Sequence, residues 1–493
     1  MLLQTIVRTD TGAVTGVEDR GAVRFRGIPY AAAPFGRNRL RPPAPVTAWE
    51  GVRDTSEFGP GVPQSAFDGD PFNAYFNPRR QGEDCLTVDV WTPDATSSGL
   101  PVMVWIHGGG FITGTGSAPA HDGFTFARDG IVHVGINYRL GVDGFTFFDD
   151  GIENLGLLDQ IAALEWVQRN IAAFGGDPDQ VTVFGQSGGA VAVMDLLAMP
   201  RARGLFARAI AMSGSPAVSA SVESALRVTT RLAERFGIAP TREAFAALPV
   251  ERTLSEVIPM AMEFVDFTQW GTESFTVSPF RAVHGTATMP SSLLDSASES
   301  TVPLMTGTTR NEATGFLAAL GLLPAMPEEA GQAMFGLMSA DDEVQAHYRG
   351  GPRRLESTVE LAEAVWTDWA FRIPTLQLVE ARRAPSHVYE FHWASPSFPP
   401  GLGSNHALDV PFMRDDLATM RGVGVAGEAL LGPEAPQELA TQMHEAFAAY
   451  ARDGDPGWPA YDEIDRSTMV FDTVSTLEND PAATERQAWK GRR

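Results

Sequence analysis

The chain has 493 residues, of which 44% are hydrophobic and 20% are charged, a composition typical of a globular protein with a large core. The formal net charge of −24 makes binding to a nucleic-acid backbone unfavourable. Cys85 is the only cysteine, which excludes an intrachain disulfide and a cysteine-based metal site. The N-terminal stretch soon meets polar and charged residues, and no stretch approaches about 18 uninterrupted apolar residues. We therefore expect a soluble, cytoplasmic protein that contacts neither membrane nor nucleic acid.

The order of apolar segments predicts an α/β protein. The N-terminal residues 5–31 alternate apolar and polar positions between glycines, as β-strands joined by turns do. Six later segments have the apolar, β-branched character of strands buried on both faces: 100–109, 130–140, 180–186, 208–214, 301–309 and 386–393. Helical patterns fall between several of them, most clearly at 157–176, which ends at a glycine. This alternation predicts a large, mainly parallel central sheet with helices on both faces.

Two stretches, 217–295 and 314–385, are more helical and more polar than the rest. We expect them to form helical lobes around an active-site cleft. The Pro/Gly-rich stretch 395–405 is expected to be a loop and not a linker, because patterned sequence continues on both sides of it. The chain is therefore expected to form a single domain over residues 1–493.

The segment "VTVFGQSGGAVAV" (181–193) places Ser187 between a predicted buried strand and a predicted helix. One interpretation is a tight turn that happens to contain a serine. The other is a nucleophile elbow, in which Gly185 and Gly189 allow the strand and helix to pass closely and the serine hydroxyl is exposed. Matches to G-x-S-x-G occur often by chance, so the motif alone leaves both interpretations open.

A nucleophilic serine needs a base, which on this kind of sheet follows the serine and the acid in the chain. The histidines that follow any plausible acid are His347, His387, His392, His406 and His444. His347 and His444 have helical, charged surroundings typical of solvated surface positions, and His387 and His392 lie within a predicted strand, where a packed histidine is the ordinary case. His406 lies in a loop just after a strand, where catalytic groups gather, and it is the best candidate base.

The acid should lie between Ser187 and His406. Glu312 comes just beyond a buried strand, in a turn rich in Gly, Thr and Asn. Asp295 and Glu299 are competitors in a polar, surface-like stretch. Position favours Glu312 over them only modestly.

The segment "WIHGGGFITG" (105–114) has three consecutive glycines directly after a predicted strand. Such a run loses much conformational entropy on folding, so a simple turn does not account for it. It suits a loop whose backbone amides point one way and bind an oxyanion, each donor contributing about 3–4 kcal/mol. Together with the elbow, this loop favours a serine hydrolase.

Further landmarks complete the pattern: "FRGIPYAAAP" (25–34), "EDCLTVDVWTP" (83–93), "GTTRNEA" (307–313) and "NHALDVPF" (405–412). With the glycine loop and the elbow, the chain resembles the type-B carboxylesterases over nearly its whole length. The resemblance implies the α/β-hydrolase fold and the hydrolysis of carboxylic esters through an acyl-enzyme, without cofactor or metal. It assigns Ser187 as nucleophile, Glu312 as acid and His406 as base, in agreement with their positions.

The resemblance also implies an oxyanion hole made by the amides of Gly109, Gly110 and Gly188. It suggests Ser213 as a hydroxyl near the acid, although an ordinary serine at a strand end is an equally good interpretation.

The chain departs from the family at Gln186, where many relatives have glutamate. The neutral amide removes a negative charge beside the nucleophile and argues against a choline-like cationic substrate. Cys85 has no partner for the disulfide of eukaryotic relatives. By the same resemblance, Glu83 and Asp84 are expected in structural salt bridges.

Aromatic residues concentrate in 67–76 and 262–275, which either pack a lobe or line the cleft. If they line the cleft, they favour short-chain and aryl esters over long-chain lipids. A carbamate or amide hydrolase with the same triad is the main alternative, and a non-catalytic cholinesterase-like binding protein is weaker because all three triad residues are present. The absence of H-E-x-x-H disfavours a metal hydrolase. We expect the protein to be a monomer. Its expected binding partner is a small-molecule ester substrate.

Overall fold

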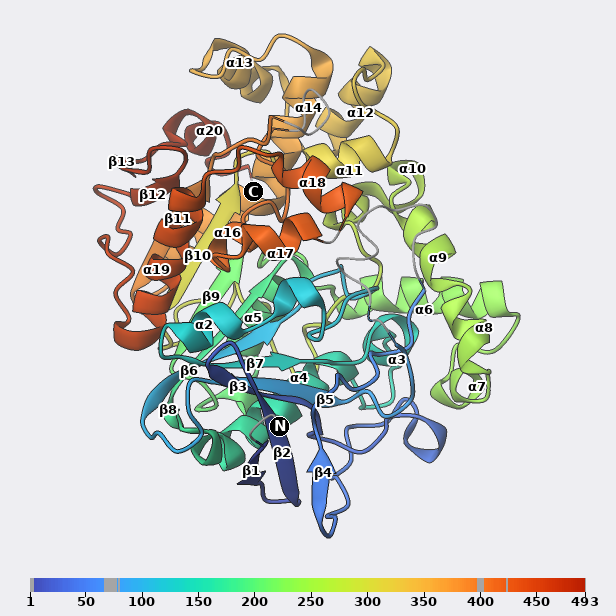
Figure 1. Ribbon diagram of the computed structural model, residues 1–493. Coiled ribbons are helices and arrows are strands. Elements are labelled where there is room, and N and C mark those ends of the chain that lie inside the picture. Colours follow the sequence, from blue (N-terminus) through green and yellow to red (C-terminus); the bar gives the residue numbers. More distant parts are fainter. Residues whose placement is uncertain (1–3, 66–77, 79, 397–402, 423, 493) are drawn as a thin grey trace.

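The computed structural model describes residues 4–65, 78, 80–396, 403–422 and 424–492. A single 13-stranded sheet passes through these residues, and Figure 1 shows it with the N-terminal strands at the bottom and the C-terminal strands at the left. Its strands are β1 (Gln4–Arg8), β2 (Ala13–Asp19), β3 (Ala22–Pro29), β4 (Val52–Asp54), β5 (Thr87–Thr92), β6 (Leu100–Ile106), β7 (Val132–Ile136), β8 (Gly176–Gln186), β9 (Arg208–Met212), β10 (Leu304–Thr309), β11 (Ser386–Phe391), β12 (Ser467–Phe471) and β13 (Thr476–Asn479).

The strands follow the order β1-β2-β3-β5-β7-β6-β8-β9-β10-β11-β12-β13, and β4 pairs with β2. From β7 to β12 in this order, each strand is parallel to the next. The strands β1, β2, β3, β5 and β7 pair antiparallel in turn, and β13 is antiparallel to β12. The predicted class, a large and mainly parallel sheet, is confirmed. The six predicted central strands correspond to β6, β7, β8, β9, β10 and β11.

The central strands are mostly buried because helices cover both faces of the sheet. Along β6, Val102, Val104 and Ile106 point into one buried cluster. Met103 and Trp105 between them point into a second cluster on the opposite face. This alternation within a continuous apolar run is expected of a strand with two buried faces.

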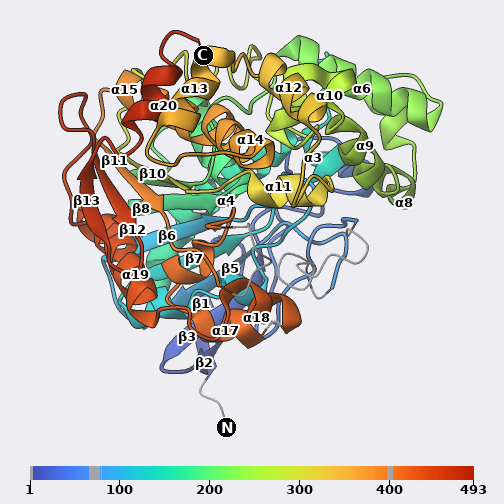
Figure 2. The same cartoon turned by 90° about the horizontal axis from the view of Figure 1, so that it is seen from above.

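The helices cover the sheet and form the lobes, and Figure 2 shows them around the sheet from above. They are α2 (Phe124–Arg128), α3 (Gly141–Phe145), α4 (Leu155–Asn170), α5 (Gly188–Ala198), α6 (Val222–Phe236), α7 (Arg242–Ala246), α8 (Val250–Leu254), α9 (Val257–Phe264), α10 (Phe267–Trp270), α11 (Thr314–Ala319), α12 (Glu328–Leu337), α13 (Asp342–Gly350), α14 (Thr358–Thr367), α15 (Ile373–Ala381), α16 (Val410–Met413), α17 (Leu417–Gly422), α18 (Val425–Leu431), α19 (Gln437–Asp453) and α20 (Ala483–Ala488). None of these described helices is both long and apolar enough to cross a membrane.

The helix predicted at 157–176 is α4, continued by a short 3₁₀ turn, and it ends at Gly175 in the left-handed conformation. The segments 217–295 and 314–385 contribute α6 to α10 and α11 to α15. In Figure 1, α12, α13 and α14 lie together at the top and α6 to α9 at the right.

The aromatic residues of 262–275 pack the lobe. Phe264 and Trp270 belong to the main core, and Phe275 packs against Trp366 in a third cluster. The packing interpretation of this segment therefore holds for these three residues. The other aromatic segment, 67–76, lies outside the described residues.

Candidate active site

Ser187 occupies a strained turn between β8 and α5. Its backbone has φ 56° and ψ −125°, a combination that an L-residue rarely adopts. Its amide donates to the Met212 carbonyl of β9 at 2.9 Å, and its carbonyl accepts from Val191 of α5 at 2.9 Å. The side chain is partly exposed, unlike its buried neighbours on both sides. This geometry differs from that of an ordinary tight turn and is typical of a nucleophile elbow.

The two glycines of the motif make the turn possible. A Cβ at Gly185 would lie 2.6 Å from the carbonyl carbon of Gly189. A Cβ at Gly189 would lie 2.1 Å from the Ile106 carbonyl oxygen of β6. Both contacts are with backbone, which cannot move aside as a flexible side chain can. The turn therefore depends on glycine at both positions.

Glu312 and His406 form a hydrogen-bonded pair although 94 positions separate them. His406 Nδ1 donates to Glu312 Oε2 at 2.5 Å, and the backbone amide of Thr309 donates to Glu312 Oε1 at 2.7 Å. Glu312 is fully buried. Because Nδ1 carries the proton of this hydrogen bond, Nε2 of the neutral ring carries a lone pair and can accept a proton.

The loops that carry this pair are joined by polar contacts. Asn311 and Asn405 form a parallel bridge, and the Asn311 amide donates to the Ser404 carbonyl at 3.0 Å. The amide of Gly315 donates to Asn405 Oδ1 at 3.0 Å. The rings of Phe316 and Phe371 flank His406, with centroids at 5.2 and 5.5 Å. These contacts fix the imidazole next to the carboxylate.

Gln186 connects His406 with the elbow. Its side-chain Nε2 lies 3.2 Å from His406 Nε2, so the amide donates to the lone pair of the ring. Within the described part of the chain, His406 makes no hydrogen bond to Ser187 Oγ. The structure thus brings His406 beside the residue that precedes Ser187, with the Gln186 amide on the Nε2 side of the ring. Catalytic hydrogen bonds are often long or misaligned until substrate is bound.

The glycine loop after β6 packs against the elbow. A Cβ at Gly108 would lie 2.7 Å from the Gln186 carbonyl oxygen and 3.2 Å from Ser187 Cβ. A Cβ at Gly188 would lie 3.1 Å from the Gly110 nitrogen and 3.2 Å from the Phe111 nitrogen. The loop and the start of α5 are therefore in close backbone contact.

The loop carbonyls are held in fixed directions. His107 Nδ1 donates to the Gly108 carbonyl at 2.8 Å, and the amides of Ile112 and Thr113 donate to the Gly109 carbonyl at 2.9 and 3.1 Å. In a trans peptide the N–H points opposite to the C=O, so these bonds also orient the amides of Gly109 and Gly110. Burial lowers the pKa of His107 to about 4, so this ring is neutral at ordinary pH.

Two buried carboxyl groups, one after His406 and one on α5, were not identified from the sequence. Asp409, three residues after His406, accepts from the Tyr389 hydroxyl at 3.2 Å, and burial together with the charge of Glu312 raises its pKa to about 7. Asp195 lies on α5 and accepts from Ser219, and burial raises its pKa to about 7. In the sequence, only the position of Asp409 three residues after His406 indicated that it could lie near this histidine. Neither group adds a full negative charge below neutral pH.

The other candidate bases lie elsewhere. The prediction of a surface position for His444 is wrong: it is buried on α19, and its two ring nitrogens contact the Met413 carbonyl and Asp129 at 2.9 Å each. The charged pattern around it belongs to the outer face of the helix, whereas His444 lies on the inner face. His387 is packed in β11 against the Trp458 carbonyl, His392 pairs with Glu390, and His347 is half-buried on α13.

The competing acids are not near His406. Asp295 accepts from Ser292 in an exposed turn, and Glu299 forms an exposed ion pair with Arg203. Of the three residues considered for the acid, Glu312 is the one that contacts His406.

Ser213 lies at the end of β9 with φ 51°, and its amide donates to the Gly307 carbonyl of β10. Its hydroxyl is buried and makes no hydrogen bond to Glu312 or to any other described residue. Its role near the acid stays a prediction. Glu83 and Asp84 are exposed, and no ion pair of theirs occurs among the described residues. The described residues also contain no cluster of three or more His, Cys, Asp or Glu side chains able to hold a metal ion.

Comparison with known proteins gives a consistent result. The sequence profile described as "Carboxylesterase family" matches residues 3–489. The chain is 36% identical to the para-nitrobenzyl esterase of Bacillus subtilis strain 168 over 98% of both chains, and 34% identical to the phenmedipham hydrolase of Pseudarthrobacter oxydans over 95% of both. Among solved structures, a thermophilic PNB esterase superposes with a TM-score of 0.83 at 34% identity, over 99% of this chain and 100% of the other.

Proposed function

The chain belongs to the carboxylesterase family and is a carboxylic ester hydrolase with the α/β-hydrolase fold, and we propose that it cleaves its substrates through an acyl-enzyme on Ser187. The family and the fold inferred from the sequence motifs are thereby confirmed. In our proposal His406 is the base and Glu312 is the acid. The observation that carries it is the short hydrogen bond from His406 Nδ1 to the buried Glu312, which leaves Nε2 free of a proton beside the elbow.

The proposed reaction has two halves. In the first, Ser187 Oγ attacks the ester carbonyl while His406 Nε2 takes the hydroxyl proton, and Glu312 stabilises the resulting imidazolium. The C–O bond to the alcohol then breaks, and the alcohol leaves with the proton from His406. In the second half a water molecule gives its proton to His406 and attacks the acyl carbon, which releases the acid and restores the Ser187 hydroxyl.

We assign the oxyanion hole to the backbone amides of Gly109, Gly110 and Gly188. The support is geometric: the glycine loop lies against the elbow, and hydrogen bonds to the carbonyls of Gly108 and Gly109 orient the first two amides. Pre-oriented amides stabilise a tetrahedral oxyanion without reorganising during the reaction.

Gln186 has two consequences in this mechanism. It holds His406 Nε2 before substrate is bound, so the imidazole must exchange this amide for the Ser187 hydroxyl. It also places no charge beside the nucleophile, so a cationic alcohol group gains no attraction there. We therefore propose neutral esters as substrates and expect no particular advantage for choline esters.

We propose short-chain and aryl esters as the substrate class. Phe316 and Phe371 beside His406 offer aromatic surface near the reacting atoms, which takes the place of the wall expected from 262–275. The name of the para-nitrobenzyl esterase relative agrees with an aromatic ester. Carbamate or amide cleavage by the same three residues is the second candidate, since relatives of similar identity carry names as different as phenmedipham hydrolase.

The test of the nucleophile is covalent labelling. An organophosphate should attach at Ser187, and Ser187→Ala should lower kcat by about 10⁶. The matched control is Ser215→Ala, a buried serine beyond β9 whose hydroxyl accepts from the nearby Ala217 amide, and it should be labelled at Ser187 as the wild type is. Labelling at another residue, or activity that survives Ser187→Ala, would refute the assignment.

The test of the substrate class compares p-nitrophenyl butyrate, p-nitrophenyl palmitate and butyrylcholine at equal conditions, with a carbamate and an anilide added. We expect the highest kcat/KM for the butyrate. A preference for palmitate or for the choline ester would contradict the proposed class, and faster turnover of the carbamate or anilide would favour the second candidate.

We further propose that the protein acts as a monomer in the cytoplasm. The single cysteine, which is buried, suits a reducing compartment. Sedimentation of the purified protein tests the monomeric state. Fractionation of its host cells tests the cytoplasmic location.

A further inference from the structure

Ser278 contacts the glycine loop from a distant part of the chain. Its hydroxyl donates to the Gly110 carbonyl at 2.6 Å and accepts from the Phe280 amide at 3.2 Å. Ser278 is buried, and a Cβ at Gly110 would lie 3.7 Å from Ser278 Cβ. The two residues are therefore in direct contact across 168 positions.

This contact completes the fixation of the loop carbonyls. Those of Gly108 and Gly109 are held by groups within residues 107–113, whereas that of Gly110 is held by Ser278. Gly110 has φ +60°, which glycine exchanges for its mirror conformation at little cost. A hydrogen bond to its carbonyl therefore selects one orientation of the Gly110–Phe111 peptide and restrains the position of Gly110.

The segment that presents Ser278 is itself strained. Val277, the residue before it, has φ +69°. A β-branched residue rarely adopts this conformation, which persists where the surrounding structure enforces it. Such strain is common where a neighbouring group must point in one direction. Here the neighbouring group is the Ser278 hydroxyl.

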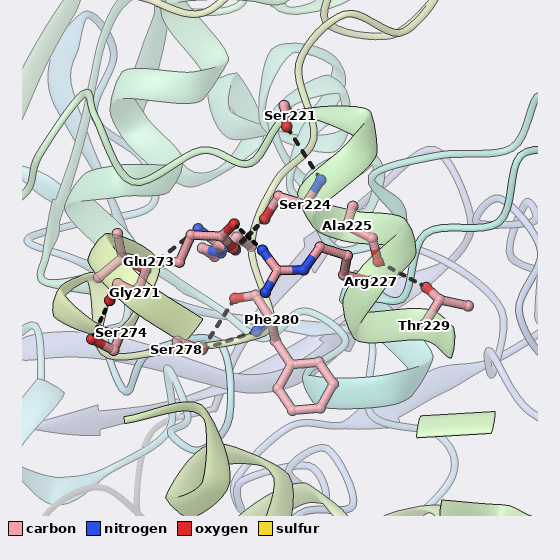
Figure 3. Close-up of polar contacts among 12 residues, drawn as sticks. Ser221, Ser224, Ala225, Arg227, Thr229, Gly271, Glu273, Ser274, Ser278 and Phe280 are labelled. Atoms are coloured by element: carbon pink, nitrogen blue, oxygen red, sulfur yellow. Dashed lines mark hydrogen bonds and ion pairs between the residues drawn. The ribbon is translucent and has the colours of Figure 1, made fainter. Parts of the chain in front are cut away.

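An ion-pair cluster anchors the same segment to α6. Glu273 accepts from Arg227 at 3.0 Å and from Arg281 at 2.9 Å, and it also contacts the Ser224 hydroxyl. Arg281 is buried and donates to Ser224 Oγ at 2.7 Å. Figure 3 shows Ser224 and Arg227 of α6 turned towards Glu273, with Ser278 and Phe280 on the adjoining irregular segment. The cluster holds both ends of residues 273–281 in place.

We propose that Ser278 is a positioning residue for the oxyanion hole: anchored through Glu273 and Arg281, it fixes the Gly110 end of the glycine loop in the orientation that binds the transition state. This inference rests on the proposed function, in which the amide of Gly110 is an oxyanion donor. Ser278 acts through Gly110 and touches neither Ser187 nor His406 in the described contacts. Its loss should therefore affect the transition state more than the bound substrate.

The experiment compares Ser278→Ala with Ser278→Thr and with Ser274→Ala. Ser274 is the matched control because it is buried in the same segment and its hydroxyl donates to the Gly271 carbonyl at 2.7 Å, away from the glycine loop. Each variant is assayed for kcat and KM with p-nitrophenyl butyrate, for inhibition by a trifluoromethyl ketone, which forms an oxyanion on the serine, and for its Tm.

We expect Ser278→Ala to lower kcat roughly tenfold, less than the loss of a donor itself, with KM nearly unchanged. The trifluoromethyl ketone should bind weaker by a similar factor. Ser278→Thr, which keeps the hydroxyl, should restore most of both, and Ser274→Ala should retain wild-type kcat even if its Tm falls.

Equal kcat in Ser278→Ala and Ser274→Ala would overturn the inference, as would a fall in kcat that follows Tm alone in all variants. Neither result touches the proposed function, which fails separately if the wild-type protein is not labelled at Ser187.

Discussion

The proposed nucleophile and the proposed acid–base pair are held in place by different means. Ser187 is fixed by its backbone, through hydrogen bonds to β9 and α5 and through glycines that allow β6, β8 and α5 to touch. Glu312 and His406 are fixed by side chains and by loops, through the Asn311–Asn405 bridge and the flanking phenylalanines. The glycines of the first region leave no room for a Cβ atom, whereas the second region depends on particular hydrogen-bonding groups in its loops.

The difference gives the two regions different sensitivities. A change in the elbow should affect folding and activity together, because the same backbone contacts support both. A change in the acid–base loops should affect activity with a much smaller effect on folding. Four substitutions test this contrast, in order of decreasing effect.

Glu312→Gln should have the largest effect. The amide keeps the shape of the side chain but no longer accepts a charge-assisted bond from Nδ1 or stabilises the imidazolium, and the loss in kcat should be about 10⁴-fold. The control is Glu363→Gln, a buried glutamate that contacts Asn311 and Thr367 but not His406. A similar loss of kcat in both variants would mean that kcat depends on the packing of these loops and not on the Glu312 carboxylate.

Gly189→Ala should destabilise the fold by about 3 kcal/mol or more, because the new Cβ would lie 2.1 Å from the Ile106 carbonyl oxygen. Urea unfolding and kcat should both report the change. Gly336→Ala on α12 is the control, since a Cβ there meets nothing within 4 Å and should be neutral or stabilising. Unchanged stability in Gly189→Ala would contradict the account of the elbow.

Asp195→Asn tests the helix behind the elbow through pH. The folded protein keeps the proton of Asp195 up to about pH 7, whereas the unfolded chain loses it near the ordinary carboxyl pKa. Stability contributed by this group is therefore present at acidic pH and is lost as pH rises from about 4 to about 7, by a few kcal/mol at about 1.4 kcal/mol per pKa unit. Urea unfolding across this range should show a smaller pH dependence in the variant, and equal slopes would refute the assignment.

Asn405→Ala should have the smallest effect. It removes the acceptor of the Gly315 amide and loosens the loop that carries His406, so kcat should fall about tenfold. Stability should fall by about 1 kcal/mol, the usual value for one hydrogen bond. Asn479→Ala on the exposed β13 is the control and should leave kcat unchanged. If Asn405→Ala lost as much stability as Gly189→Ala, the elbow and the acid–base loops would not differ in their effect on folding.

The contrast also explains what could be predicted from the sequence. The central strands and the elbow depend on neighbouring residues. Apolar runs were sufficient to find the strands, and the spacing of Gly185, Ser187 and Gly189 favoured the elbow once it was combined with the glycine loop at 105–114. Glu312 and His406 could be selected from chain order and loop position, but nothing local indicated that the loops join through Asn311 and Asn405.

Other features depend on contacts that the sequence does not display. His444 looked solvated because its helix is charged, yet its own face of α19 packs inward against Asp129. Ser278 gave no signal, because its partner Gly110 is 168 positions away. Whether the aromatic residues of 262–275 line a cleft or pack a lobe could not be decided until the helices around them were placed.

The strand order has a consequence for the way the protein acquires its activity. The elbow follows β8, the proposed acid follows β10 and the proposed base follows β11, so the site is spread over strands contributed by the middle and the late part of the chain. Pairing of such distant, parallel strands is intrinsically slow. The hydrolase should therefore remain inactive until the strands from β6 to β11 have paired with one another. During refolding from urea, recovery of ester hydrolysis should lag behind the return of the protein's intrinsic tryptophan fluorescence.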